Sequence, residues 1–137
     1  MITHCFYKKL PKEAVEIRTS VFVDEQGFTE EFDQLDKQAV HVVIFFDGIP
    51  AATGRVFIED GIYYIGRVAV QKQFRGQHLG AEVLYLLEKW VKEDGGSCVH
   101  LFAQCHAQGF YEKCGYLMNG ETHMEEYCPH VGMTKKI

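Results

Sequence analysis

The sequence predicts an α/β domain with a mixed, mostly antiparallel sheet, and three observations lead to this prediction. β-Rich runs joined by short turns between residues 40 and 70 indicate an antiparallel meander. A helical pattern then separates two apolar strands, 62–70 and 98–103, and a helical crossover makes the strands that it joins parallel. The length of 137 residues, 47% of them hydrophobic, suits one globular domain over residues 1–137.

The first third of the chain is expected to contain a short strand, a helix and an acidic segment. The strand covers His4 to Tyr7. Pro11 starts a helix that runs to about residue 22 or 23, because proline is tolerated in a first helical turn, where its missing N–H would be unpaired. From Asp24 to Asp36 there are six acidic side chains and no Lys or Arg. This segment either attracts a cationic substrate or forms a solvated face.

The middle of the chain is predicted to be the antiparallel meander. Val40 to Phe46 and Ile49 to Ile58 are its first two strands, and Asp47-Gly48 between them is a hairpin turn signal. Residues 59–61 turn the chain into the strand from Ile62 to Val70, whose aromatic and β-branched residues indicate burial on at least one face.

A helix is predicted from Leu79 to Asp94, because the apolar spacing there changes from about two to about 3.6. The turn before it, residues 71–80, is expected to bind an anion, since the first helical turn has unpaired N–H groups and a positive dipole end. Gly76 and Gly80 let a ligand approach the backbone. A nucleoside triphosphate loop would need Lys-Ser or Lys-Thr where Ala81-Glu82 stand, and no dinucleotide-binding G-x-G-x-x-G is present.

The last third is expected to begin with a strand over 98–103, parallel to the strand at 62–70. Two parallel strands that splay around a ligand would form a natural cleft. Residues 104–114 are predicted to form a short helix capped by Gly115, and a strand follows at 116–118. The tail, residues 121–137, is predicted to add two more short strands.

Composition excludes several classes of function. The net charge of -5 and the isoelectric point of about 5.8 argue against a nucleic-acid binder, which would need a basic face. No run is long enough to span a bilayer and the N-terminus lacks a signal peptide pattern, so a cytoplasmic protein is expected. The five cysteines form an odd set without C-x-x-C, and the spacing of His123, Cys128 and His130 matches no zinc pattern, so no metal is expected.

The loop Arg75-Gly76-Gln77-His78-Leu79-Gly80-Ala81 resembles the acyl-CoA pyrophosphate loop of the GNAT superfamily of N-acetyltransferases, whose pattern is [Q/R]-x-x-G-x-[G/A]. His78 stands at the middle glycine of that pattern. A second GNAT signature follows, because Phe110-Tyr111 and Gly115-Tyr116 fit Phe-Tyr-x-x-x-Gly-[Phe/Tyr]. Further fragments are similar to the small, single-domain bacterial subgroup called ElaA/YjcF-like; they are residues 21–26, Asp33 with Asp36, His41, Gly54-Arg55, residues 66–70, and His130 with Met133.

The resemblance implies the GNAT fold, with six or seven strands, a splayed parallel pair and about four helices. It also implies acetyl-CoA as co-substrate, no metal, and direct attack of a primary amine on the thioester. The residues that would bind acetyl-CoA are Val68, Ala69, Val70, Arg75, Gly76, Gln77, His78, Leu79, Gly80, Ala81, Gln104, Phe110 and Tyr111.

Acetyl transfer needs an oxyanion donor, a general acid and a neutral amine. The resemblance assigns the first role to the backbone N–H of Val70. Tyr111 is the candidate acid, because a phenol with a pKa of about 10 is protonated at neutral pH and can donate to a thiolate; the alternative is a core aromatic. His78 either donates to the pyrophosphate or points to solvent.

The acceptor side is the least determined part of the site. Glu25, His41 and His123 are candidate bases, with Arg55 and Arg67 as orienting groups and Gln26 beside them, and each is alternatively structural. The acceptor, a small-molecule or peptide amine, is not identified, and the oligomeric state stays open, a homodimer included. The alternative function is a domain that binds acyl-CoA as a sensor or partner without turnover.

Overall fold

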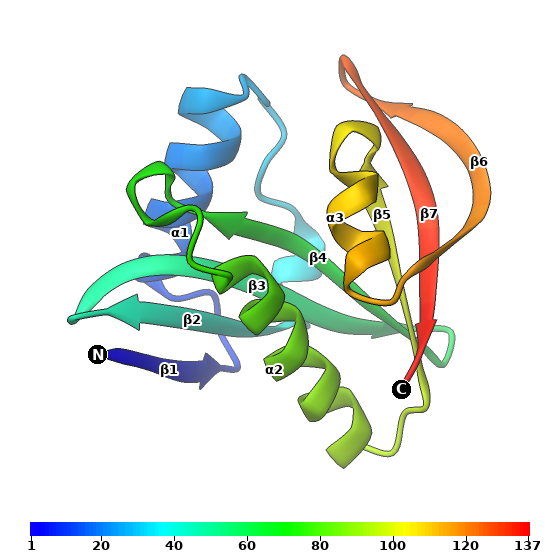
Figure 1. Cartoon of the computed structure of the whole chain (residues 1–137), viewed down its shortest axis with the longest axis horizontal. Helices are drawn as coiled ribbons and strands as arrows, with labels where there is room; N and C mark the ends of the chain where they lie inside the picture. Colours follow the sequence, from blue (N-terminus) through cyan, green and yellow to red (C-terminus); the bar gives the residue numbers. More distant parts are fainter.

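The computed structural model describes residues 1–137 and is built around a seven-stranded sheet in the order β1-β2-β3-β4-β5-β7-β6 (Figure 1). Only the neighbours β4 and β5 are parallel, so the predicted mixed, mostly antiparallel sheet is confirmed. The strands are β1 (Ile2–Tyr7), β2 (Val40–Phe46), β3 (Ile49–Glu59), β4 (Ile62–Val70), β5 (Cys98–Gln104), β6 (Leu117–Glu125) and β7 (Cys128–Lys136).

Three α-helices and four π-helical or 3-10 segments complete the fold. The α-helices are α1 (Lys12–Arg18), α2 (Leu79–Glu93) and α3 (Gln108–Lys113). The others are the π-helical η1 (Thr19–Glu25) and the 3-10 segments η2 (Gln34–Lys37), η3 (Lys72–Phe74) and η4 (Cys105–Ala107). The expected number of about four helices is reached only when η1 is counted. None of the helices has the length and apolar character needed to cross a bilayer.

Helices α1 and α2 cover opposite faces of the sheet (Figure 1). Successive side chains of a strand point to opposite faces, and β2 shows the consequence. Val42 and Ile44 join the core under α2, whereas Val43 joins the core under α1. Helix α3 contributes Tyr111 to the α2 side. Ala69 of β4 also joins the core under α1, whereas α1 does not reach β5 or β7.

The predicted first helix is divided in two. Pro11 is the N-cap of α1, with extended backbone (φ -81°, ψ 156°), and the α-helix ends at Arg18. The π-helical η1 continues the chain to Glu25. A π-helix widens the turn by one residue, so the apolar stripe alone could not show where the α-helix stops.

The C-terminal tail differs from the prediction. Residues 117–125 form the single strand β6, where the prediction had a strand at 116–118 and a separate short strand in the tail. A bulge at residues 119–121 keeps both parts in one strand. Met118 pairs with Met133, and Thr122 pairs with Val131. The three residues 119–121 of β6 between these pairs therefore lie opposite the single residue Gly132 of β7. A side chain on Gly132 would meet the Asn119 amide oxygen at 2.8 Å, so the glycine makes room for the bulge.

Strands β4 and β5 pair at only two positions, residues 63–64 with residues 99–100. Beyond these positions β4 stays paired only with β3, and β5 stays paired only with β7. The two parallel strands therefore separate, as predicted for a splayed pair. A bulge lies in this part of β4, because Arg67 and Val68 together face Gly54 of β3. Arg67 has a left-handed φ of 51°. Such a bulge bends and twists its strand, which carries the end of β4 away from β5.

Candidate active site

A cavity of about 1110 Å³ lies where β4 and β5 separate, and side chains from both faces of the sheet line it. Leu79 and Tyr111 line it from the side of α2 and α3. Tyr64 and His130 line it from the α1 side, since their neighbours Ile65 and Val131 point into the α2 core. A ligand in the gap can therefore present its reactive end to a second molecule across the sheet.

The backbone N–H of Val70 faces this gap. Gln71 N donates to Ala51 O of β3 at 2.8 Å, and consecutive N–H groups of a strand point to opposite edges. The Val70 N–H therefore points away from β3, toward the side where β5 has separated. The Val70 carbonyl accepts a hydrogen bond from Arg75 Nε at 3.1 Å, which ties the strand end to the following loop.

The loop before α2 presents a row of free donors. None of the backbone N–H groups from residue 76 to residue 81 donates to a protein acceptor, and the first helical bond, from Glu82 N, goes back to His78 O. Gly76 and His78 both have left-handed backbone, with φ of 85° and 61°. At Gly80 the constraint is packing, because a Cβ there would lie 3.0 Å from the Phe110 ring.

Arg75 is held at the mouth of the cavity by Glu25 of η1. Two hydrogen bonds of 2.7 Å join the guanidinium to the carboxylate, and both side chains line the cavity. The bonded guanidinium lowers the pKa of Glu25, so the carboxylate is ionised at neutral pH. An anion that bound Arg75 would compete with Glu25 for the same donors.

Tyr111 lies on α3, packed edge-on against Phe110 and Tyr116. Its hydroxyl donates to no protein group, although the residue lines the cavity. Burial, together with the nearby Cys114, raises the pKa of Tyr111 above its usual value, so the phenol keeps its proton at neutral pH.

Most of the residues predicted from the sequence line this one cavity. On the acetyl-CoA side they are Val68, Ala69, Val70, Arg75, Gly76, His78, Leu79, Gly80, Gln104, Phe110 and Tyr111, and on the acceptor side Glu25, Gln26, Arg55 and Arg67. Four predicted residues do not line it, namely Gln77, Ala81, His41 and His123. Gln77 is exposed on the loop and Ala81 lies in the first turn of α2.

His41 and His123, the other candidate bases, do not line the cavity. His41 is 1% exposed on β2, and its Nε2 contacts the Asp36 carbonyl at 3.1 Å. Burial lowers the pKa of His41, consistent with a neutral structural side chain. His123 is on the edge strand β6, and its Nε2 lies 2.9 Å from the Glu125 carboxylate. Its ring packs against the rings of Phe102 and His130.

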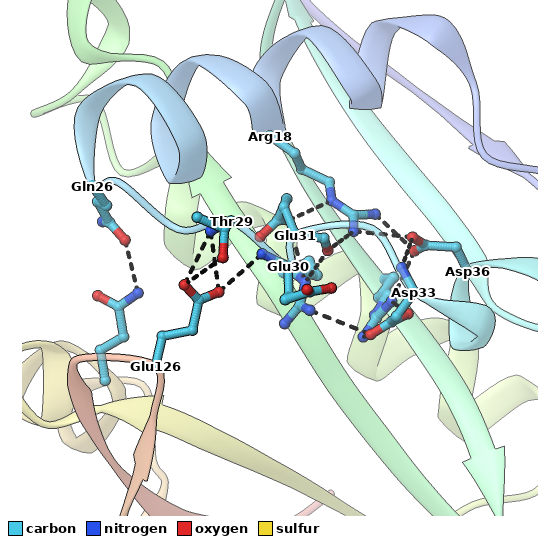
Figure 2. Close-up of polar contacts among 11 residues, drawn as sticks. Arg18, Gln26, Thr29, Glu30, Glu31, Asp33, Asp36 and Glu126 are labelled. Carbon is cyan, nitrogen blue, oxygen red and sulfur yellow. Dashed lines mark hydrogen bonds and ion pairs between the residues drawn. The ribbon is translucent and has the colours of Figure 1, made fainter.

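Three arginines pair with Glu31, Asp33 and Asp36 of the acidic segment, whereas Asp24 and Glu30 are exposed and make no salt bridge. Figure 2 shows Arg18 between Glu31 and Asp36. Arg18 is 1% exposed and bonds Glu31 and Asp36 at 2.8 Å. Arg55 bonds Asp33 at 2.7 Å and Asp36 at 2.8 Å. Arg67 completes the network at 3.2 Å from Glu31 and 3.3 Å from Asp33. The network fixes the segment against β3 and β4 and orders one wall of the cavity.

The β6–β7 hairpin tip fastens the same segment from the other side (Figure 2). The Glu126 carboxylate accepts hydrogen bonds of 2.9 to 3.1 Å from the Thr29 and Glu30 N–H groups and from the Thr29 hydroxyl. Tyr127 donates to the Gln26 carbonyl and stacks on Phe28 at 5.2 Å. The hairpin and the segment after η1 together form a bridge over the acceptor side of the cavity.

His130 lines the cavity, although the sequence analysis did not propose it as a site residue. It is 7% exposed, and its Nδ1 lies 3.0 Å from the Cys128 carbonyl, which can only accept a hydrogen bond. In the neutral ring Nδ1 therefore carries the proton and Nε2 the lone pair, and Nε2 has no protein partner. In the sequence, His130 belongs to the C-terminal fragment that resembles the ElaA/YjcF-like subgroup. The alternation of side chains along β7 predicts which face of the sheet His130 points to, but core and cavity lie on the same face.

The family model described as an acetyltransferase (GNAT) domain matches residues 7–137. The chain belongs to the GNAT acetyltransferase family. The GNAT fold predicted from the resemblance is confirmed, because the crystal structure of Escherichia coli ElaA superposes with a TM-score of 0.86 at 27% identity, covering 99% of this chain and 100% of that one. Membership assigns acyl transfer as the class of activity.

Two further GNAT proteins are similar to the chain, one in sequence and one in fold. The uncharacterized N-acetyltransferase YjcF of Bacillus subtilis is 33% identical over 127 residues, which are 90% of this chain and 91% of YjcF. With ElaA, it bears out the predicted subgroup. A GNAT acetyltransferase from Elizabethkingia anophelis, solved with acetyl-CoA bound, has the same fold at a TM-score of 0.79 and 13% identity, covering 99% of this chain and 98% of that one.

Proposed function

We propose that this GNAT domain, residues 1–137, transfers an acetyl group from acetyl-CoA to a primary amine. The observation that carries the proposal is the free Val70 N–H at the gap between β4 and β5, continuous with the free N–H groups before α2. The loop donors and Arg75 suit a diphosphate, and the gap suits the thioester. Acetyl-CoA in the Elizabethkingia relative of the same fold supports this choice of co-substrate.

The residues divide the chemistry between the two faces of the sheet. On the α1 side, His130 Nε2 takes a proton from the ammonium group, directly or through one water, and leaves the amine neutral. The Val70 N–H stabilises the negative oxygen as the nitrogen–carbon bond forms. On the α2 side, the Tyr111 hydroxyl donates to the sulfur as the carbon–sulfur bond breaks. The adduct nitrogen then carries two protons: one stays in the amide, the other restores the Tyr111 hydroxyl, and His130 returns its proton to solvent.

The raised pKa of Tyr111 limits how this donation occurs. Full transfer from a phenol to a thiolate of pKa about 8.5 is uphill by at least about 2 kcal/mol. Tyr111 therefore acts by a hydrogen bond that strengthens as charge develops on sulfur, and the proton moves only when the carbon–sulfur bond is broken.

The proposal is tested by acetyl-CoA binding and consumption. Isothermal titration should show acetyl-CoA binding, and a thiol-release assay over a panel of amines should show turnover with at least one. Binding without turnover on any amine would favour the acyl-CoA sensor, and no binding would exclude both functions.

The pair Arg75 and Glu25 gives a sharper test of the loop. Arg75→Glu should raise the acetyl-CoA Kd at least tenfold, because it reverses a phosphate contact. Glu25→Gln should lower the Kd, since Arg75 loses its bidentate competitor. Lys89→Glu, the same charge reversal at an exposed residue of α2 that does not line the cavity, is the control. An unchanged Kd for Arg75→Glu would contradict the loop assignment.

A further inference from the structure

Three aromatic side chains form a continuous row on the α1 side of the sheet. Phe57 of β3 stacks on Tyr64 of β4 with ring centroids 5.4 Å apart and an angle of 19° between planes. Tyr64 stacks on Phe102 of β5 at 6.2 Å and 14°. We call Phe57, Tyr64 and Phe102 the aromatic row. Cross-strand register places them together, since they stand on three adjacent strands and share one face.

The aromatic row is open to the cavity. All three side chains line it, and Phe102 is 56% exposed. The neighbours Val56, Ile65 and Leu101 point to the other face and are buried in the α2 core. The row is therefore not part of the core and presents apolar ring surface to whatever enters the acceptor side.

Carboxylates without a cationic partner flank the aromatic row. Glu59 at the end of β3 and Glu30 in the segment after η1 line the cavity, and neither makes a salt bridge with its side chain. The other two lining acids of that segment, Glu31 and Asp33, are already paired with arginines. The uncompensated charge beside the row is negative, and aromatic faces also attract cations.

We propose that the acceptor is a small aromatic primary amine that binds as its ammonium ion, with its ring on the aromatic row. This inference rests on the proposed acetyl transfer. Phe102 precedes Gln104 by two residues, about 7 Å along the strand, and Gln104 is the cross-strand partner of His130. An amine two or three carbons from its ring reaches from the aromatic row to His130. A long polyamine would leave the row uncovered.

The first experiment compares probes on the intact protein. With acetyl-CoA, kcat/KM for 2-phenylethylamine and tryptamine should exceed that for spermidine and for a short peptide with a free N-terminus by at least tenfold. Phenylacetate, which has the ring but the opposite charge, should not compete with 2-phenylethylamine. Equal or better turnover of spermidine or the peptide overturns this inference and leaves acetyl transfer standing, whereas absence of acetyl-CoA binding overturns both.

The second experiment uses variants. Phe102→Ala should raise the KM for 2-phenylethylamine at least fivefold and leave the acetyl-CoA Kd unchanged, and the exposed Phe102 can be truncated without unfolding. Glu59→Gln should raise the same KM severalfold, less so in high salt. Tyr85→Ala is the matched control, since Tyr85 is 56% exposed on α2 and does not line the cavity. An unchanged KM in Phe102→Ala contradicts the proposal.

Discussion

Tyr111 and His130 lie on opposite sides of the gap between β4 and β5, and their hydrogen bonds suit them to opposite roles. The Tyr111 hydroxyl has no protein acceptor and keeps its proton, because burial raises its pKa. His130 donates its Nδ1 proton to the Cys128 carbonyl, so the neutral ring has its lone pair on Nε2. Local contacts thus provide one donor and one acceptor, each facing the side where the proposed reaction needs it.

Replacing Tyr111 should separate catalysis from binding. Tyr111→Phe is expected to lower kcat at least tenfold, since the departing sulfur loses its donor, while the acetyl-CoA Kd changes little. Because the pKa of Tyr111 is raised, the wild-type rate should show no loss from Tyr111 ionisation up to about pH 9. Steady-state kinetics and titration calorimetry measure these effects. An unchanged kcat would leave Tyr111 as a core aromatic.

Replacing His130 should make the rate depend on the amine's own ionisation. His130→Gln is expected to lower kcat/KM at pH 7 by about 10²-fold, the low end for general base catalysis. The rate of the variant should rise close to tenfold per pH unit between pH 7 and 9, as the free amine becomes more abundant. Gln108→Ala, outside the cavity, is the control. A uniform loss at every pH would indicate a structural role for His130.

At the scale of elements, the segment after η1 is a wall that two other elements hold in place. The arginine network attaches it to β3 and β4, and the β6–β7 hairpin attaches it from the far side of the gap (Figure 2). The hairpin contact is the weaker of the two, because Glu126 is exposed and acts through hydrogen bonds to a loop backbone. This bridge is the part of the wall best suited to open for an acceptor.

Glu126→Gln should loosen the bridge. The variant side chain keeps one good acceptor oxygen in place of two charged ones, so amide hydrogen exchange at residues 29 and 30 should become faster. The hydrogen bonds from Glu30 and Thr29 lower the pKa of Glu126, so the wild-type contact is present above about pH 4.3 and is lost as the pH falls through that lowered pKa. Glu121→Gln, on exposed β6, is the control. Equal exchange in both variants would contradict the bridge.

At the scale of the whole molecule, the buried network around Asp36 links α1, the acidic segment and β3. Burial by itself would raise the pKa of Asp36, but hydrogen bonds from Arg18 and Arg55 outweigh it and lower that pKa to about 2. The stabilising effect of the ionised Asp36 is therefore complete above about pH 4 and is lost between about pH 4 and pH 2.

Glu31 acts in the opposite sense, because burial raises its pKa. Its protonation adds stability as the pH falls toward about 4.3.

Asp36→Asn should destabilise the fold by about 3 to 5 kcal/mol at pH 7, because two buried guanidinium groups lose their shared partner. The thermal midpoint of the variant should also depend less on pH between pH 4 and pH 2 than that of the wild type. Thermal unfolding at several pH values measures both effects. Asp24→Asn, at an exposed acid of the same segment that makes no salt bridge, is the control.

Much of the fold could be predicted, and most residues proposed to bind acetyl-CoA line one cavity, because both depend on local sequence. The alternation in β2 to β4, the stripe of α2 and the glycine-containing loop between them all act over a few residues. The order of these elements then required the β4–β5 parallel pair. Even so, the Arg67 bulge and the π-helical η1 were not predicted, since each adds a residue without changing the surrounding apolar pattern.

The acceptor side was decided by tertiary structure, because its contacts join residues far apart in the chain. Arg18 meets Asp36 across 18 positions, and Glu126 meets Thr29 across 97. Such pairs determine which acids are neutralised. Tertiary contacts also bury His41 outside the cavity, whereas His130 lines it. The sequence by itself determined which groups are present and where an anion can bind; only the register of the strands decided which of those groups face a common substrate.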